Sequence, residues 1–200
     1  NPVLRDTIAP GRAFGHYVVD QILGQGGMGT VYRARHTKLN RWVAIKTIPS
    51  DLVRNQELLS RFDREMTSIG RLNHPNVVGA MDAGMIDGIP YLVMELLEGT
   101  DLRRHIIENG PVVPRVACEL LRQVAMGLAC AHQNGLVHRD IKPANLFLTD
   151  SGVVKLLDLG LAKLTNSGDM ESSEQQLSRG FGQLGTLDYM SPEQWDGVES

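Results

Sequence analysis

The sequence has few of the features that mark disulfide-rich, zinc-binding or membrane-spanning proteins. Its 200 residues include only two cysteines, Cys118 and Cys130, with no CxxC pair. We therefore expect neither a disulfide framework nor a zinc site, and a reducing compartment fits this composition. No run of about 18 apolar residues occurs, so no membrane segment is expected within these residues. The net charge of −3 argues against nucleic acid as the main partner.

Functional side chains are concentrated in the stretch HRDIKPAN at 138–145. There an acid, Asp140, a cation, Lys142, and an amide, Asn145, lie within six residues. A carboxylate can accept the proton of a hydroxyl while a neighbouring ammonium stabilises a phosphate group in transfer. With a second acid, Asp158 in LLDLG, the amide offers the oxygen ligands that Mg²⁺ prefers. The pattern predicts phosphoryl transfer to a hydroxyl, whereas Asp140 and Lys142 alone would also fit a surface ion pair.

A glycine-rich turn predicts a second contact with phosphate. The sequence over 16–36 has the pattern strand, turn, strand, with Gly24, Gly26, Gly27 and Gly29 in the turn and Val31 after it. Because glycine has no side chain, backbone N–H groups of such a turn can approach phosphates closely. A GxGxxG pattern also occurs in dinucleotide-binding folds, but there a helix follows the turn. The valine-rich strand that follows here favours a hairpin over nucleotide phosphates.

A lysine inside an apolar strand, Lys46 in RWVAIKTI, needs a partner for its charge. Glu65 is the predicted partner, because helical spacing over 58–72 places it on the apolar face of a helix. The alternative is an edge-strand lysine whose ammonium reaches water. The HPN sequence at 74–76 is expected to end the helix, since the residue before proline avoids helical geometry.

The remaining pattern predicts two strands within 77–97 around a turn at Asp87-Gly88, and a strand pair around Gly152. The segment after the second of the two strands either offers backbone hydrogen bonds to an adenine edge or is an ordinary loop. Asp101 is a plausible N-cap for the helix that follows. The clearest helix spans 114–133 and is expected to bury one stripe. That stripe consists of Val116, Leu120, Leu121, Val124, Leu128 and Ala131.

Two segments are expected to lie outside the packed elements. Residues 1–15 are expected to form an arm, because prolines, glycines and polar residues dominate there. The polar stretch 163–185 is expected to be a mobile loop. It carries five hydroxyl residues, namely Thr165, Ser167, Ser172, Ser173 and Ser178.

In their order along the chain, the glycine turn, Lys46, Glu65, HRDIKPAN, DLG and SPE resemble a protein kinase over 16–197. The position of Lys142, two residues after Asp140, resembles the serine/threonine branch of the family. The glycine loop, the HPN segment and the SPEQ ending resemble bacterial eukaryotic-like (Hanks-type) kinases. The resemblance implies an α+β, bilobal fold. After the arm at 1–15, residues 16–97 would form an N-lobe with an antiparallel sheet and one αC-type helix.

Residues 98–200 would then form a partial, mainly helical C-lobe with the catalytic loop and the activation segment. We expect this lobe to be truncated, because in the family further helices follow the SPE motif and here only seven residues follow Glu193. The 200 residues are accordingly expected to be catalytically weak when isolated.

The resemblance implies a role for each polar residue. Asp140 would accept the proton of the substrate hydroxyl, and Lys142 would stabilise the transferring phosphoryl group. Asn145 and Asp158 would hold Mg²⁺. His138 is expected to have a structural role beneath the loop.

The resemblance also implies a binding site for ATP. Lys46, held by Glu65, would bind the α- and β-phosphates and complete the catalytic set. The residues that would cover or line the nucleotide are Leu23, Gly24, Gly26, Gly27, Gly29, Val31, Ala44, Met94, Glu95, Leu97, Asp101 and Phe147. The apolar ones among them would pass as ordinary core residues if the polar motifs were absent.

Two residues depart from the family pattern. Leu159 occupies the position where the family usually has phenylalanine, but it is apolar and able to pack against the αC-type helix, so activity should survive. Phe147 is a bulkier floor for the adenine than the usual aliphatic residue, and it is expected to narrow the pocket or tilt the base.

The resemblance implies an ATP- and Mg²⁺-dependent kinase acting on serine and threonine hydroxyls of proteins, its own chain among the candidates, and not on nucleic acid. A pseudokinase-type nucleotide-binding scaffold and a small-molecule phosphotransferase are the alternatives. The kinase portion is expected in the cytoplasm, and membrane anchoring of the full protein stays open. Phosphorylation is expected in the loop at 158–193, with Ser178 as first candidate and Arg139 as the cation that would pair with the phosphate.

Overall fold

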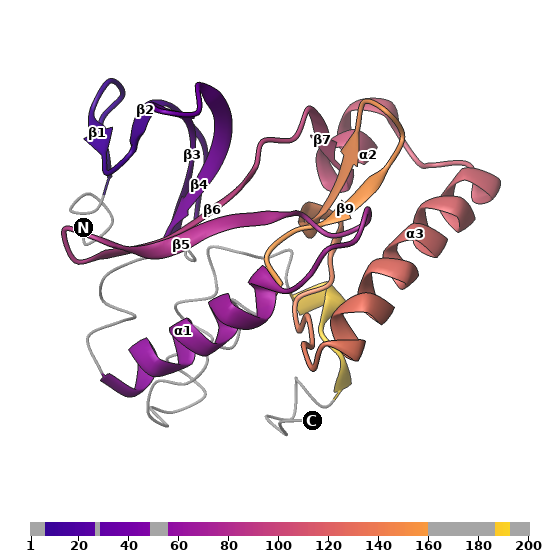
Figure 1. The fold of residues 1–200 in the computed structure, drawn as a ribbon. Helices are drawn as coiled ribbons and strands as arrows, with labels where there is room; N and C mark the ends of the chain where they lie inside the picture. Colours follow the sequence, from indigo (N-terminus) through magenta and orange to yellow (C-terminus); the bar gives the residue numbers. More distant parts are fainter. Residues whose placement is uncertain (1–6, 27–28, 49–55, 160–186, 193–200) are drawn as a thin grey trace.

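The computed structural model describes residues 7–26, 29–48, 56–159 and 187–192 (Figure 1). A six-stranded antiparallel sheet in the order β1-β2-β3-β4-β6-β5 forms most of the N-terminal half. Its strands are β1 (Ala13–Phe14), β2 (Tyr17–Gly26), β3 (Gly29–His36), β4 (Arg41–Thr47), β5 (Ala80–Ile86) and β6 (Ile89–Glu95). Helix α1 (Gln56–Gly70) lies along β5 (Figure 1). These elements match the N-lobe expected from the sequence.

The C-terminal half contains a smaller sheet and two longer helices. Strands β7 (Gly99–Asp101), β8 (Leu146–Thr149) and β9 (Val154–Leu156) pair antiparallel in that order. The helices are α2 (Leu102–Asn109) and α3 (Pro114–Gln133), with short 3₁₀ turns at η3 (Pro143–Asn145) and η4 (Leu187–Tyr189). Asp101 caps α2 as predicted, because its Oδ1 accepts a hydrogen bond of 2.9 Å from the backbone N–H of Arg104.

Strand β4 is buried on both faces because it separates two cores. Val43 and Ile45 point into a cluster with Tyr32 and Val93, whereas Ala44 belongs to the cluster that continues toward α1 and the second sheet. A strand with both faces covered has a continuous apolar run instead of an alternating one. Lys46 continues this run, and it is itself buried.

The hairpin between β5 and β6 turns at Asp87-Gly88, as the sequence predicts. Both residues have positive φ, 52° and 78°. This is the backbone of a two-residue turn whose twist matches that of the flanking strands. Glycine and aspartate tolerate this conformation better than other residues, which is why the turn is readable from the sequence.

The predicted arm is partly structured. Ile8 and Phe14 are buried in the N-lobe core, and the backbone N–H of Ile8 donates to the hydroxyl of Tyr32 at 3.0 Å. Phe14 also contacts Tyr91 edge-on, with ring centroids 5.4 Å apart. The part of the expected arm that contains Ile8 and Phe14 therefore covers one face of the sheet. The sequence did not predict this packing, because the apolar residues there are too widely spaced to show a strand or helix period.

Helix α3 buries a narrower stripe than predicted. Its buried residues are Leu120, Val124, Gly127 and Ala131. Val116 and Leu121 are exposed in this structure, so their assignment to the stripe was wrong. The stripe follows the line of contact with β9, where a Cβ added to Gly127 would lie 2.7 Å from the carbonyl oxygen of Asn76. The absence of a side chain at Gly127 thus allows the helix to approach the segment after α1.

That segment joins the two halves through Asn76. Its buried side chain donates to the carbonyl of Val154 at 2.8 Å and to Oε1 of Gln123 at 3.1 Å. Its own carbonyl accepts from the N–H of Leu156 at 2.9 Å. The sequence suggested only a helix end at HPN, yet Asn76 connects the end of α1 to both β9 and α3.

Candidate active site

Asp140, Lys142 and Asn145 form one cluster in the loop that leads into η3. The ammonium of Lys142 lies 2.8 Å from Oδ2 of Asp140, and both side chains are mostly buried, 14% and 11% exposed. The Asn145 amide donates to the same Oδ2 at 2.9 Å and to the Asp140 carbonyl at 2.8 Å. Such burial and convergence argue against an ordinary surface ion pair, whose partners are usually solvated.

The loop before this cluster is held by His138 and by an unusual backbone. His138 is buried, and its Nδ1 accepts a hydrogen bond of 3.4 Å from the N–H of Asp140. Burial lowers the pKa of His138, so the neutral imidazole is favoured in the folded protein. Arg139 has a φ of 65°, and non-glycine residues in this region carry strain that is common at functional sites. These features fit the structural role predicted for His138.

Asp158 approaches the same cluster from the end of β9. The N–H of Leu157 donates to the carbonyl of Asn145 at 3.0 Å, which fixes the chain next to Asp158 against the loop at 138–145. Asp158 has a φ of 57°, the second non-glycine residue of the site with a left-handed backbone. This hydrogen bond and the bend at Asp158 together direct the Asp158 carboxylate toward β4.

Lys46 of β4 forms an ion pair with Asp158. Its Nζ lies 2.8 Å from Oδ1 of Asp158, and the lysine side chain is only 4% exposed. The predicted pair with Glu65 is not found among the ion pairs of the described ranges. Glu65 does lie half-buried on the inward face of α1, beside the buried Phe62 and Met66, as predicted. The helical period placed the residue on the correct face but could not tell which carboxylate Lys46 contacts.

The donor set at the ends of β8 and β9 suits Mg²⁺ accompanied by phosphate. Asn145 and Asp158 supply an amide and a carboxylate, and Mg²⁺ is commonly bound by one or two such groups together with substrate phosphates. Among the described residues no group of three or more His, Cys, Asp and Glu side chains could hold a metal by itself. The residues thus fit a metal that arrives with a nucleotide better than a resident metal centre.

Apolar residues predicted to surround the adenine come from both lobes. Ala44 and Met94 are buried and directly opposite each other in the β4–β6 pair. Phe147 is half-buried in β8, opposite Lys155 of β9. A small cavity next to Met94 is lined by Ile69 of α1, Val78, Ala80, Leu92, Asp158 and Leu159. Leu159 is buried there beside α1, as its apolar character predicted.

The glycine turn is a hairpin between β2 and β3. Gly24 faces Val31 across the pair, and Gly26 faces Gly29. Gly29 has a φ of 117°, and a Cβ added to it would overlap the carbonyl oxygen of Thr47. Glycine is therefore required at Gly29, whereas Gly27 lies outside the described residues. Leu23, the predicted contact before the turn, is exposed.

The segment that connects the lobes begins at Glu95. Its backbone N–H donates to the carbonyl of Gly79 at 3.0 Å, so a backbone contact from Glu95 to adenine would use its carbonyl. Leu97 packs against the main core. The Oδ1 of Asp101 is engaged as the cap of α2. The sequence did not reveal that the Glu95 side chain points away toward Lys155, at 2.6 Å.

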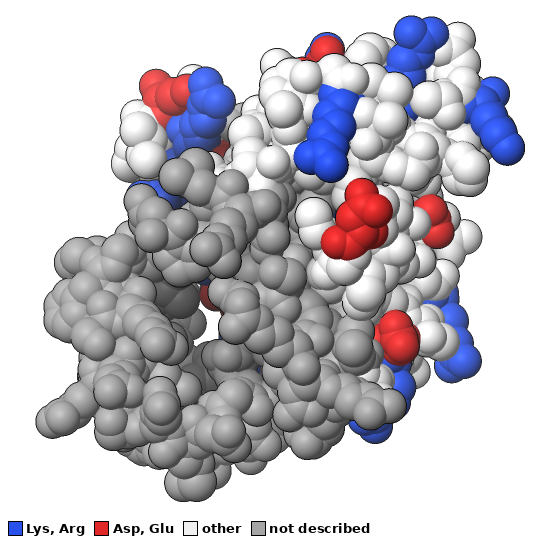
Figure 2. Space-filling model, turned by 90° about the vertical axis from the view of Figure 1, so that its left-hand side faces the viewer, with Lys and Arg blue, Asp and Glu red and all other residues white. Residues whose placement is uncertain are grey.

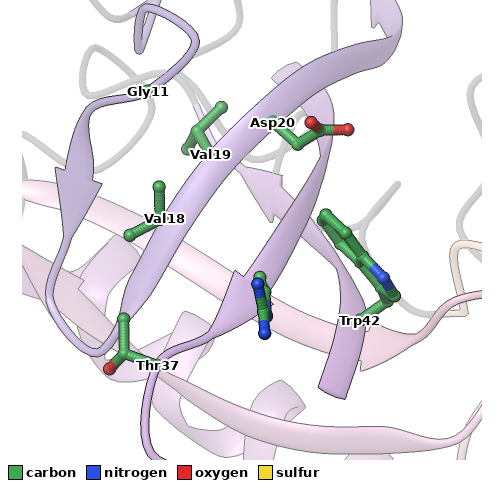
Figure 3. A pocket seen from close by; sticks show the side chains of 7 residues that line it. Gly11, Val18, Val19, Asp20, Thr37 and Trp42 are labelled. Carbon is green, nitrogen blue, oxygen red and sulfur yellow. The ribbon is translucent and has the colours of Figure 1, made fainter. Parts of the chain in front are cut away.

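One hollow in the described part of the chain lies away from these residues. It has a volume of about 460 Å³ and lies against β2, β3 and β4 (Figure 3). Its lining residues are Gly11, Val18, Val19, Asp20, Arg35, Thr37 and Trp42, none of which was predicted to bind nucleotide. On the described part of the face shown in Figure 2, acidic and basic side chains are interspersed. Ser178 and the rest of the loop expected at 163–185 lie outside the described residues.

Comparison with known proteins identifies the family. The family model of the protein kinase domain matches residues 17–198. The chain belongs to the protein kinase family. It is 39% identical over 186 residues to the serine/threonine-protein kinase PrkC of Bacillus subtilis, covering 93% of this chain and 28% of that protein. It is 40% identical over 190 residues to PknL of Mycobacterium tuberculosis, covering 95% of this chain and 46% of that protein.

The fold is also similar to that of a solved kinase domain. A crystal structure of the PknI kinase domain of Mycobacterium tuberculosis matches with a TM-score of 0.71 and 31% identity, covering 97% of this chain and 69% of that one. The bilobal kinase fold and the resemblance to bacterial serine/threonine kinases are thus confirmed. This kinase chain spans between about a quarter and a half of the length of PrkC and PknL. In the described ranges no helix is long and apolar enough to cross a membrane.

Proposed function

We propose that the protein transfers the γ-phosphoryl group of ATP to serine or threonine hydroxyls of protein substrates, with Mg²⁺ bound alongside the nucleotide. The observation that carries this proposal is the cluster of Asp140, Lys142 and Asn145, with Asp158 fixed beside it through Leu157. The names of relatives at about 40% identity, all serine/threonine-protein kinases, support the same reaction. Protein substrates, this chain among the candidates, belong to the proposal.

Asp140 would act on the substrate hydroxyl. Its Oδ2 interacts with both the Lys142 ammonium and the Asn145 amide, and these two contacts orient the carboxylate. As the hydroxyl oxygen bonds to the γ-phosphorus, its proton passes to the Asp140 carboxylate, and the bond to the ADP oxygen breaks. Lys142, 2.8 Å from Asp140, would stabilise the charge on the phosphoryl oxygens.

Lys46, Asn145 and Asp158 account for nucleotide binding. Bound Mg²⁺ would neutralise phosphate charge, and Asn145 and Asp158 would hold it. Lys46 is buried, and its partner at 2.8 Å is the Asp158 carboxylate, which would serve as metal ligand. On binding, Lys46 exchanges Asp158 for the α- and β-phosphates. The glycine hairpin of β2 and β3 would then cover the phosphates.

The alternatives differ from this proposal in chemistry. A pseudokinase-type scaffold would bind nucleotide without needing an oriented acid, whereas Asp140 here is held by two partners. A small-molecule phosphotransferase would use the same acid on a different acceptor, so the acceptor has to be identified directly. We place the kinase portion in the cytoplasm, where ATP and Mg²⁺ are available and the two cysteines stay reduced.

The test is transfer of the labelled γ-phosphate from ATP to protein. The purified protein is incubated with Mg²⁺ and a general acceptor such as casein, and with EDTA in a parallel sample. We expect phosphoserine or phosphothreonine on casein or on the kinase chain itself, only in the presence of Mg²⁺. Nucleotide binding without any transfer would favour the scaffold. Label found only on small hydroxyl compounds would favour the small-molecule phosphotransferase.

A further inference from the structure

The carboxylate of Glu95 joins three segments next to the predicted nucleotide site. Its Oε1 accepts a hydrogen bond of 2.7 Å from the backbone N–H of Gly79 and lies 2.6 Å from Nζ of Lys155. The same Nζ donates to the carbonyl of Val77 at 3.4 Å. Both side chains are mostly buried, with Glu95 29% and Lys155 16% exposed. We call Glu95, Lys155, Val77 and Gly79 the hinge cluster.

The hinge cluster ties the roof of the predicted nucleotide pocket to its floor. Glu95 ends β6 and directly follows Met94, which pairs with Ala44 in the roof. Lys155 lies in β9 opposite Phe147, the predicted floor under the adenine. A change in the distance between Glu95 and Lys155 therefore changes the separation of the two surfaces that would enclose the base.

Other ion pairs of the described residues do not have this placement. Outside the site, the pairs join residues of the same lobe, namely Arg33 with Asp20, Arg104 with Glu108, and Arg122 with Glu119. They are also more exposed than Glu95 and Lys155. A partly buried pair that also satisfies backbone N–H and C=O groups is screened less by solvent. Removing one of its partners therefore costs more stabilising free energy than in an exposed pair.

We propose that Glu95 and Lys155 are positioning residues that set the separation of the two lobes and thereby raise the affinity for Mg²⁺-ATP. This inference rests on the proposed function, because it assumes that the nucleotide binds between Ala44 and Phe147. It assigns the Glu95 side chain a role separate from any contact of its backbone with adenine. A cleft already held at the right width spends less binding energy on ordering when the nucleotide enters.

Two variants test the hinge cluster without removing a group that touches nucleotide. Lys155→Met keeps the length of the side chain and removes its charge. Glu95→Gln keeps an acceptor for the Gly79 N–H and weakens the attraction to Lys155. We expect the Kd for Mg²⁺-ATP, measured by calorimetry, and the KM for ATP to rise about three- to tenfold. A tenfold rise in Kd corresponds to a loss of about 1.4 kcal/mol in binding free energy. For Lys155→Met, the kcat at saturating ATP should stay within about twofold.

Two further variants serve as controls. Lys155→Arg retains the charge and should recover most of the lost affinity. Arg122→Met removes a similar charge from an exposed pair within α3, 2.7 Å from Glu119, and should leave the Kd unchanged. Urea unfolding of each variant gives the folded fraction, so that Kd values are corrected for it. If Lys155→Met does not fold, Glu95→Gln alone decides.

The possible results separate this inference from the proposed function. If the wild-type protein binds no Mg²⁺-ATP, the proposed function fails. If the wild-type protein binds and both variants bind equally well or more tightly, only the role of the hinge cluster is overturned. A fall in kcat without a rise in KM, or an affinity loss that vanishes after correction for the folded fraction, would also overturn it.

Discussion

The catalytic loop and the junction between the lobes differ in how far apart their interacting residues lie in the sequence. In the catalytic loop, Asp140 interacts with Lys142 and Asn145, which follow within five residues. At the junction, Asn76 bonds to Gln123 and Val154, which lie 47 and 78 residues away. The loop brings reactive groups together locally, whereas the junction holds distant elements in place. We therefore expect changes in the loop to affect turnover and changes at the junction to affect stability.

The largest expected effect is on turnover, in the variant Asp140→Asn. Loss of a positioned base typically lowers the rate by about 10²- to 10⁴-fold. The Kd for Mg²⁺-ATP should change little, because Asp140 interacts with the catalytic loop and not with Lys46 or the glycine hairpin. Initial rates of labelled phosphate transfer, together with calorimetric titration of nucleotide, measure both quantities. Unchanged turnover would remove Asp140 from the role of base.

At the junction, Asn76→Ala should lower the free energy of unfolding by about 2–3 kcal/mol, because the buried carbonyl of Val154 loses a donor and Gln123 Oε1 keeps only the N–H of Val154. Urea unfolding of wild type and variant measures the difference. Asn109→Ala is the control, since its amide bonds to the carbonyl of His105 on the exposed surface of α2. Its effect should stay within about 0.5 kcal/mol. Equal effects of the two variants would contradict the role of Asn76.

The sequence predicts contacts within the catalytic loop better than contacts between residues that are far apart in the chain. The acid, cation and amide of the catalytic loop were predictable because their spacing is short and their chemistry is specific. The position of Glu65 on the inner face of α1 followed from helical period. The choice of Asp158 as partner of Lys46 did not, because the two residues meet only after both lobes have folded. The burial of Ile8 and the bond of Glu95 to Lys155 have the same cause: nothing local in the sequence reports a contact across many residues.

Helix α3 shows the same limit for packing. Its apolar residues outnumber those in the buried stripe, so the period alone could not exclude Val116 and Leu121. The stripe is marked instead by Gly127, where the carbonyl of Asn76 comes closest to the helix. A glycine in a helix interior is read from sequence as a weakness, whereas here it is the point of closest contact.

A smaller stability effect is expected from Gly127→Ala. The added Cβ would lie 2.7 Å from the Asn76 carbonyl oxygen and 2.8 Å from Leu156 Cδ1, so backbone or side chains must shift. Overpacking of this kind costs about 1–3 kcal/mol. In the helical control Gly70→Ala, no atom lies within 4 Å of the new Cβ, and we expect no loss of stability or a small gain. Thermal unfolding compares the two variants, and a neutral Gly127→Ala would show that the helix is free to move outward.

The smallest expected effect is the pH dependence contributed by His138. Burial lowers its pKa in the folded protein, so the unfolded chain binds the proton more readily as pH falls through the unfolded value of about 6.5. The contribution of His138 to stability is thus complete above this pH and is lost as the pH falls below it. An NMR titration of the imidazole should give a pKa below 6.5 in the folded state. A value at or above 6.5 would contradict burial of the neutral ring.

The most direct test of the contrast is the free energy of unfolding of Asp140→Asn, determined on the same preparation used for its turnover. Asparagine can still accept hydrogen bonds from Lys142 and Asn145. Because the Lys142 ammonium then faces a neutral amide, we expect a loss of stability, but one no larger than the loss of about 2–3 kcal/mol expected for Asn76→Ala. Transfer of phosphate should nevertheless be lost. A variant that loses stability by several kcal/mol while it retains turnover would show that Asp140 serves the fold, and would contradict the assignment of chemistry to this loop.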